Sequence, residues 1–330
     1  MADEYVNSAA VSFAGEIISN VALNRVLVVG KGGYIGESFA DYAAGRLHVD
    51  VVDSHEGWKR ISFSGYDTVL FAAGIAHRKQ TIENRQLYFD VNCNLAIAVA
   101  EKAKVNQVKQ FVYLSSMAVY GDAAEKFSPK GEINRHTIPM PRHNDYYGQS
   151  KFEAEQALIL RFGHEDGCFK VSIVRPPMVY GVGCPGKFSQ MVKLAKFLPV
   201  VPDSKNKRSM IYIDNLCEIL YMIISEKKCE RGHSTVFPQN TEYVNTAQMI
   251  RLIRRVQGRR TLVLSGLSWC FRIAEMLPVM GHMIKNAFGS LYYASCISQA
   301  PKTNAVSLED SIRESITSVP YGDVGHNKSS

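Results

Sequence analysis

Two side chains that can transfer protons, Tyr147 and Lys151, lie four positions apart in the chain. On a helix they share one face, because residues at i and i+4 are neighbours. A nearby ammonium group favours the phenolate form of a tyrosine and can bring its pKa from about 10 towards neutrality. Such a phenolate can accept a proton from a hydroxyl group. Ser116, at the end of an expected strand, would hydrogen-bond the reacting oxygen. These three residues are the predicted catalytic residues, whereas an isolated Tyr-x-x-x-Lys would indicate only an exposed helix face.

A glycine-rich sequence, Gly30-Lys-Gly-Gly33-Tyr-Ile-Gly36, lies between a β-branched run at 26–29 and a predicted helix at 35–45. Glycines at this place allow a tight turn and let the backbone approach a pyrophosphate. The N-terminus of the following helix offers free N–H groups and a partial positive charge to the same anion. The loop therefore predicts a dinucleotide site.

An acidic residue, Asp53, ends the next apolar run, 17 positions after Gly36. An acid there accepts hydrogen bonds from the adenosine ribose and repels a 2′-phosphate, which favours NAD over NADP. NADP is not excluded, since Lys31 could bind an extra phosphate and only 14 positions separate Asp53 from Asp67. The alternative for Asp53 is a residue of a surface turn.

The elements that must position these residues alternate between short apolar runs and helical segments. The predicted strands and helices are residues 26–29, 49–52, 68–73, 110–114 and 171–174, and residues 35–45, 90–105 and 147–160. Such alternation is typical of a parallel sheet covered on both faces. We therefore predict an α/β fold, with a Rossmann-type doubly wound parallel sheet and a smaller C-terminal lobe.

Composition limits the partners and the location. The 330 residues carry a net charge of +7, spread without an aromatic–basic nucleic-acid motif, so the expected partner is an anionic, phosphate-bearing molecule and no nucleic acid. None of the seven cysteines has zinc-site spacing, which predicts no metal site and reduced thiols in the cytoplasm.

The start, Met-Ala-Asp-Glu, lacks the positive flank of a signal peptide. Charges interrupt the least polar stretch, 261–296, so it predicts core or interface helices rather than a membrane span or membrane-surface docking.

Five motifs, in this order, resemble those of the extended short-chain dehydrogenase/reductases. They are Gly30-x-x-Gly33-x-x-Gly36, Phe71-Ala-Ala-Gly74, Ser115-Ser116-Met-Ala-Val-Tyr120-Gly121, Tyr147-Gly-Gln-Ser-Lys151 and Arg175-Pro-Pro-Met-Val-Tyr180-Gly181. Within that group the chain is similar to the NAD-dependent epimerase/dehydratase family, and to bacterial UDP-glucose 4-epimerase-like proteins of polysaccharide biosynthesis. The motifs cover about residues 25–220.

The resemblance implies a set of binding residues. Those implied for the cofactor are Gly30, Gly33, Tyr34, Ile35, Gly36, Asp53, Ala72, Ala73, Gly74, Asn92, Tyr147, Lys151 and Pro176. Asn92 would steady the backbone of the active site, the alternative being an ordinary amide on a helix surface. Ser116, Met178 and Arg208 are implied for the substrate. Arg208 matches the arginine that holds the pyrophosphate of a nucleotide-linked sugar, and a UDP-sugar is the expected substrate.

The resemblance also limits the reaction. The family's 4,6-dehydratases carry an Asp-Glu pair where this chain has Met117 and Ala118, which disfavours elimination of water. The prediction is a nucleotide-sugar 4-epimerase, and the alternative is an NAD(P)H-dependent 4-keto-sugar-nucleotide reductase. Arg175-Pro-Pro-Met178 replaces the usual epimerase sequence Arg-Tyr-Phe-Asn, which keeps the reductase open. A non-catalytic dinucleotide-binding protein is a remote third hypothesis.

The predicted domain organisation has four parts. They are an N-terminal extension (1–24), an NAD(P)-binding domain (25–180 and 209–235), a nucleotide-sugar-binding lobe (181–208 and 236–315) and a flexible tail (316–330). The family resemblance further implies a homodimer through the helices near 90–105 and 147–160.

Overall fold

A parallel sheet forms the centre of the fold, in a computed structural model that describes residues 24–76, 78–121, 130–164, 169–226, 232–264, 289–303 and 305–318. Its strands are β1 (Arg25–Val29), β2 (His48–Val52), β3 (Thr68–Phe71), β4 (Gln110–Leu114), β6 (Lys170–Val174), β10 (Gly232–Pro238) and β13 (Ser298–Gln299). The spatial order is β13-β10-β6-β4-β3-β1-β2, and each neighbouring pair is parallel. The strand order reverses between β1 and β3, where doubly wound sheets bind their ligands. The prediction of a doubly wound parallel sheet is confirmed.

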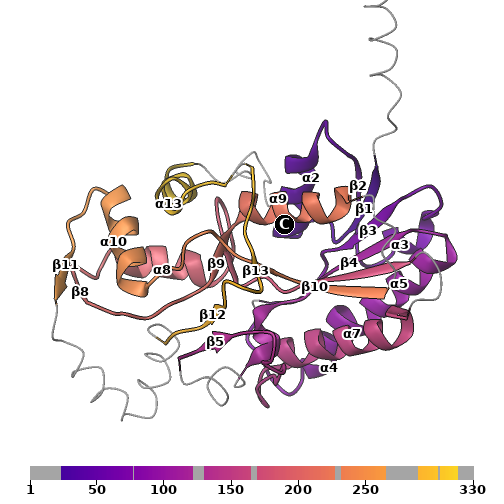
Figure 1. Cartoon of the computed structure of the whole chain (residues 1–330), viewed down its shortest axis with the longest axis horizontal. Coiled ribbons are helices and arrows are strands. Elements are labelled where there is room, and N and C mark those ends of the chain that lie inside the picture. Colours follow the sequence, from indigo (N-terminus) through magenta and orange to yellow (C-terminus); the bar gives the residue numbers. More distant parts are fainter. Residues whose placement is uncertain are drawn as a thin grey trace, which may run out of the picture.

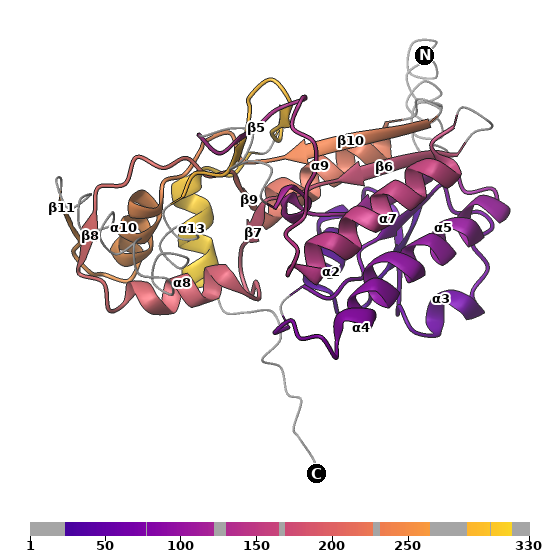
Figure 2. The same cartoon turned by 90° about the horizontal axis from the view of Figure 1, so that it is seen from below.

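Helices cover both faces because alternate residues of each strand point to opposite sides. Val26 and Val28 of β1 face a cluster that includes α2 (Tyr34–Ala43) and α9 (Ile213–Ser225). Leu27 and Val29 face a second cluster. That cluster is built with α3 (Gly57–Arg60), α5 (Leu95–Val105) and α7 (Tyr146–Phe162). Figures 1 and 2 show these two layers on either side of the sheet.

The predicted helix at 90–105 is not one regular α-helix. After α4 (Arg85–Phe89), residues Asp90–Asn94 form a π-helical turn, and α5 begins only at Leu95. A π turn holds an extra residue and recurs at functional sites. Asn92 lies within this turn and is fully buried.

A second group of elements lies beyond the carboxyl ends of the strands (Figure 2). It contains α8 (Lys187–Ala195), α10 (Thr246–Val256), α13 (Leu308–Thr317), β8 (Val200–Pro202) and β11 (Leu262–Leu264). Two further pairs of short strands are β7 (Met178–Tyr180) with β9 (Met210–Tyr212), and β5 (Glu132–Ile133) with β12 (Tyr292–Tyr293). A 3-10 turn, η2, spans Met117–Tyr120. The boundary drawn from the sequence at 235 falls inside β10, and the division into two domains remains a prediction.

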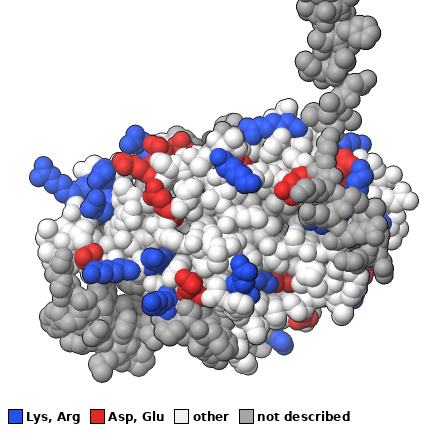
Figure 3. All heavy atoms as spheres, in the orientation of Figure 1, with Lys and Arg blue, Asp and Glu red and all other residues white. Residues whose placement is uncertain are grey.

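Several predicted segments lie outside the described residues: nearly all of the extension at 1–24, the tail beyond 318, and residues 265–288 of the apolar stretch. Among the helices of the described residues, none is long and apolar enough to cross a membrane. On the face seen in Figure 3, basic side chains lie among acidic ones.

One buried arginine, Arg254 of α10, joins the end of α8 to the segment before β11. Its guanidinium donates to the carbonyl oxygens of Ala195 (2.7 Å), Lys196 (3.2 Å) and Arg260 (2.7 Å). A cation suits the C-terminus of α8, where the last carbonyl groups lack helical partners. Arg254 therefore stabilises the outer end of this second group of elements.

We expect Arg254→Met to lower the free energy of unfolding by about 2–3 kcal/mol, because buried carbonyl groups lose their donors. The neighbouring Arg255→Met is the control, since the Arg255 side chain is half-exposed and forms a surface ion pair with Glu309 at 3.4 Å, worth about 0–1 kcal/mol. Urea unfolding measures both. Equal losses in the two variants would contradict this role.

Candidate active site

The glycine loop is packed so closely that only glycine fits at its first position. Gly30 has φ +136°, and a Cβ atom there would lie 2.7 Å from the backbone nitrogen of Ala73. At Gly33, a Cβ atom would lie 2.9 Å from the carbonyl oxygen of Gly30. The backbone nitrogens of Gly30 and Lys31 both donate to the carbonyl oxygen of Val52, at 2.9 and 3.0 Å. The ends of β1, β2 and β3 therefore meet at this loop, directly before α2.

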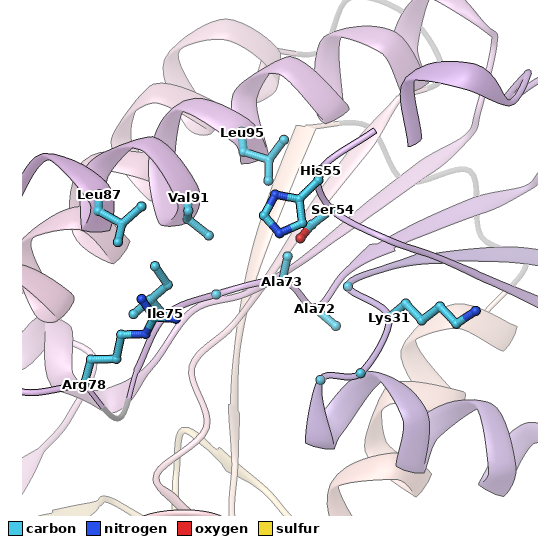
Figure 4. Close-up of a pocket in the computed structure, with 14 residues that line it drawn as sticks. Lys31, Ser54, His55, Ala72, Ala73, Ile75, Arg78, Leu87, Val91 and Leu95 are labelled. Carbon is cyan, nitrogen blue, oxygen red and sulfur yellow. The ribbon is translucent and has the colours of Figure 1, made fainter. Parts of the chain in front are cut away.

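A cavity of about 380 Å³ opens at this meeting point (Figure 4). Its lining comprises Gly30, Lys31, Gly32, Gly33, Ser54, His55, Ala72, Ala73, Gly74, Ile75, Arg78, Leu87, Val91 and Leu95. The glycine backbone at its edge and the start of α2 fit the pyrophosphate of a dinucleotide. Five predicted cofactor residues contribute to the lining: Gly30, Gly33, Ala72, Ala73 and Gly74.

The other predicted residues of this region lie outside that lining. Tyr34 has a buried hydroxyl, which a Cβ atom on Gly181 would approach to 2.5 Å. Ile35 packs partly against the hydrophobic cluster of α2 and α9. Gly36 brings α2 close to β1, since a Cβ atom there would lie 3.2 Å from Val28.

The carboxylate of Asp53 contacts backbone N–H groups of the chain, whereas the sequence predicted a contact with the cofactor ribose. Its Oδ1 atom accepts hydrogen bonds from the backbone nitrogens of His55 and Glu56, both at 2.9 Å. Backbone N–H groups of Gly57, Glu56 and His55 lower the pKa of the Asp53 carboxyl, so it remains charged. The carboxylate thus holds the turn before α3, and Ser54 and His55 line the cavity instead. Contact of Asp53 with a ribose stays a prediction.

The three predicted catalytic residues meet at the carboxyl end of β4. Ser116 follows β4, and its hydroxyl accepts from the backbone nitrogen of Ala118 at 3.1 Å. Tyr147 lies in the first turn of α7, where its hydroxyl hydrogen-bonds that of Ser116. One turn later, the Lys151 ammonium donates to the carbonyl oxygen of Leu114 at 2.7 Å. The structure therefore brings Ser116, Tyr147 and Lys151 together.

Burial shifts the pKa values of both titratable residues against their charged forms. Burial raises the pKa of Tyr147, the hydrogen bond from Ser116 lowers it, and the charge of Asp145 raises it. The lowered tyrosine pKa expected from the sequence is therefore not found in the chain alone. Burial lowers the pKa of Lys151 to about 7, and the negative charge of Glu155 opposes that shift.

Asn92 connects the strand-end loop to the catalytic helix. Its Oδ1 atom accepts from the backbone nitrogen of Ile75 at 2.9 Å, and its Nδ2 atom donates to the Ser150 hydroxyl at 3.0 Å. A Cβ atom on Gly74 would lie 3.1 Å from Oδ1 of Asn92 and 3.3 Å from Nζ of Lys151. Asn92 is thus a buried cross-link and not a surface amide, which is the arrangement that steadying the backbone requires.

Glu155 is a charged residue that the sequence analysis missed. It is fully buried and accepts from Arg175 twice, Nε to Oε1 at 2.9 Å and Nη2 to Oε2 at 2.6 Å. Ser115 also donates to Glu155, and Arg175 donates to the Tyr120 hydroxyl at 2.7 Å. The spacing of Glu155, four positions after Lys151, was the available signal, because it continues the face of Tyr147 and Lys151.

Three cations, Lys187, Arg208 and Arg142, lie near the start of α8. Burial and the positive charges of Arg208 and Arg142 lower the pKa of Lys187, while Asp145 raises it. Arg208 also donates to the carbonyl oxygen of Gly289 at 3.0 Å. Because the charges of Arg208 and Arg142 both act on Lys187, the three cations share one region, which an anion would stabilise. The sequence predicted Arg208 here but missed Arg142 and Lys187, which come from distant segments.

The two remaining predicted residues lie next to this region. The carbonyl oxygen of Pro176 accepts from the backbone nitrogen of Met117 at 2.9 Å. Met178 begins β7, opposite Met210 of β9, and is partly buried. Their contacts with a cofactor or substrate stay predictions.

We expect Gly30→Ala to weaken NAD binding at least about tenfold, because its Cβ atom forces the loop away from Ala73. Gly45→Ala is the control, since Gly45 also has a positive φ (+75°) but faces open space at the end of α2. Fluorescence titration with NADH measures both. An unchanged dissociation constant for Gly30→Ala would contradict the assignment of the loop.

We expect Glu155→Gln to move the alkaline limb of kcat to lower pH. The lost negative charge no longer raises the pKa of Lys151, so the predicted active ammonium form deprotonates below its present value of about 7. Glu153→Gln, an exposed change on the same helix, should leave the limb in place. Profiles of kcat against pH, taken well below the unfolding temperature, measure the shift. Coincident profiles for the two variants would count against the coupling.

Comparison with known proteins agrees with this geometry. The chain is similar to a UDP-glucose 4-epimerase of Vibrio cholerae, 28% identical over 228 residues, which are 68% of this chain and 67% of the relative. It is also similar to the N-acetyl-alpha-D-glucosaminyl-diphospho-ditrans,octacis-undecaprenol 4-epimerase of Escherichia coli O157:H7, 25% identical over 219 residues, with 60% and 62% covered. The structure of UDP-glucuronic acid 4-epimerase from Bacillus cereus in complex with NAD has the same fold, with a TM-score of 0.66 at 17% identity over 88% of this chain and 95% of that one.

A sequence profile of the NAD dependent epimerase/dehydratase family matches residues 26–236. The match confirms the predicted family and, with it, an NAD-dependent enzyme. A homodimer and a cytoplasmic location stay predictions. The chain belongs to the NAD-dependent epimerase/dehydratase family.

Proposed function

We propose that this protein is a 4-epimerase of nucleotide-linked sugars, with a UDP-sugar as its substrate. The observation that carries the proposal is the Ser116–Tyr147 hydroxyl pair beside Lys151, next to the glycine cradle of a dinucleotide. The 4-epimerase activity of both similar relatives supports it. The substrate class rests on the cations near α8, since arginine and lysine bind the diphosphate of such molecules.

Each residue has one task in this proposal. When bound, NAD supplies the acceptor for the hydride from C4 of the sugar and a positive charge beside Tyr147. Tyr147 accepts the proton of the C4 hydroxyl and later returns it to the same oxygen. Ser116 hydrogen-bonds that oxygen while its charge changes. Lys151 provides the positive charge that favours the phenolate of Tyr147, which burial otherwise opposes.

The substrate is held by its diphosphate. Arg208, Lys187 and Arg142 come from three separate segments, so an anion between them would relieve the repulsion that lowers the pKa of Lys187. The two relatives act on sugars joined through a diphosphate or a UDP group, which is the part that such a cluster recognises. Fixing the diphosphate leaves the sugar free to present either face of C4.

Two alternatives are weighed by residues at the site. Elimination of water is disfavoured because Met117, which is buried, and Ala118, which is partly exposed, stand where a dehydratase needs an acid and a base. A 4-keto-sugar reductase is the second candidate, and the Pro176-Pro177-Met178 sequence favours it. Met178 offers no hydrogen bond to a sugar, whereas epimerases of the family usually have asparagine there.

We expect Tyr147→Phe to lower turnover of UDP-sugars about 10²–10⁴-fold while NAD still binds, because only the proton acceptor is lost. The control is Tyr146→Phe, the same change at the preceding residue, whose ring lies 6.0 Å from Arg85. Interconversion of UDP-glucose and UDP-galactose, and of their N-acetyl forms, measures turnover. Full activity of Tyr147→Phe would overturn the mechanism.

A further inference from the structure

Exposed apolar side chains gather at the outer end of the second group of elements. We call Leu194, Phe197, Val200, Leu262 and Leu264 the lobe-end patch, and they are 57%, 79%, 42%, 57% and 36% exposed. They are half of the ten large apolar side chains that are exposed in the described residues. Single exposed apolar residues need no explanation, but a group of them indicates an interaction surface.

The pairing of β8 with β11 brings the patch together. Val200 is opposite Leu262, and Pro202 is opposite Leu264, at the far end of the molecule in Figure 1. Side chains alternate along a strand, and the inner residue of β8, Val201, is buried. The outer face of this small sheet would ordinarily be polar, yet it carries Val200, Leu262 and Leu264.

The end of α8 continues the patch. The backbone nitrogen of Phe197 donates to the carbonyl oxygen of Leu194 at 2.9 Å, which turns the chain towards β8. The backbone nitrogen of Leu262 donates to the carbonyl oxygen of Pro199 at 2.9 Å. The end of α8 is therefore tied to the small sheet by a short connection, so the exposed Leu194 and Phe197 lie near it and add to the apolar area.

Basic residues surround these side chains. Lys193, Lys196, Arg259 and Arg260 are all exposed. Arg259 donates to the carbonyl oxygen of Lys196 at 3.1 Å, so cations of α8 and of the segment before β11 are neighbours. Asp203, also exposed, is the acid that follows β8. The patch thus combines apolar side chains with an excess of positive charge.

We propose that the lobe-end patch docks on an anionic lipid bilayer. Apolar side chains that enter the headgroup region, with lysine and arginine around them, are the combination that binds such a surface. A second copy of the chain fits less well, because a two-fold interface would place the four cations of one patch against those of the other. The docking does not depend on the proposed function.

Docking would also bring the three cations near the start of α8 close to the membrane. Helix α8 runs from the cations Lys187, Arg208 and Arg142 to the patch (Figure 2). Its nine residues span about 14 Å at about 1.5 Å per residue. If the proposed function holds, a sugar diphosphate carried by a lipid comes within reach of these cations, as well as one carried by UDP.

The test is co-sedimentation of the full chain with vesicles of equal parts phosphatidylglycerol and phosphatidylcholine, and with vesicles of phosphatidylcholine alone. We expect the chain to bind the anionic vesicles and the binding to weaken as salt is added. The double variant Phe197→Glu/Leu262→Glu should bind them at least about tenfold more weakly. Val105→Glu is the matched control and should bind normally, because Val105 is 81% exposed and follows Lys104, but it ends α5, at the opposite end of the molecule from β8 and β11 (Figure 2).

A second variant separates charge from folding defects. Lys193→Gln/Lys196→Gln/Arg260→Gln should lose most of the salt-sensitive binding while unfolding at an unchanged urea concentration. Absence of binding by the unmodified chain, equal binding to both vesicle types, or unaltered binding by Phe197→Glu/Leu262→Glu would each overturn the proposal. UDP-sugar turnover in solution is measured alongside, so a failure of docking leaves the 4-epimerase proposal to be judged separately.

Discussion

The buried carboxylate of Glu155 joins the parts of the molecule on which the active site depends. It holds Arg175 at the end of β6 through two charged hydrogen bonds and accepts a third from Ser115 at the end of β4. Because Glu155 lies on the same helix face as Lys151, these contacts fix the position of the catalytic helix against two strand ends. Loss of one partner of a fully buried ion pair costs about 3–5 kcal/mol, so this connection is strongly maintained. The Tyr293 hydroxyl donates to the carbonyl oxygen of Arg175 at 2.8 Å, which extends the connection beyond the sheet.

In the proposed mechanism, the same burial makes Tyr147 depend on a positive charge nearby. Tyr147 and Lys151 are both shifted towards their neutral forms, so the chain alone holds the tyrosine as a poor base. Proton transfer at neutral pH requires a positive charge near the phenolate. The ammonium of Lys151 and the oxidised cofactor can each supply it. The proposed mechanism therefore couples cofactor binding to proton transfer through the charge at one place, the end of β4. Glu155 contributes by favouring the charged form of Lys151.

The local parts of the fold could be predicted from sequence because they depend on short-range patterns. Apolar runs such as 110–114 became strands with the expected bounds, and the glycine loop lies where its spacing predicted. The π turn that buries Asn92 was not predictable, since an extra residue in a helix leaves the apolar pattern nearly unchanged. The expected ribose contact of Asp53 rested on position alone, and the sequence could not show that a following turn uses its carboxylate.

Features built from distant segments were the ones that sequence could not supply. Arg142, Lys187 and Arg208 share a region only because the loop before α7, the start of α8 and the bridge to Leu291 converge. The exposed outer face of β8 and β11 likewise appears only when the two strands pair, 62 positions apart in register. The apolar stretch at 261–296 predicted core or interface helices, whereas Leu262 lies in strand β11 and is 57% exposed.

A 4-epimerase takes hydride from C4 and gives it back within one turnover, so the redox state and amount of the bound cofactor test this function. Freshly purified protein is denatured, and the released dinucleotide is identified and quantified by absorbance and mass. An epimerase regenerates its cofactor internally and need not release it, so we expect NAD+ in a molar amount close to that of the protein. Protein that is free of dinucleotide and consumes added NADH or NADPH with 4-keto sugars would contradict the 4-epimerase function and establish the reductase.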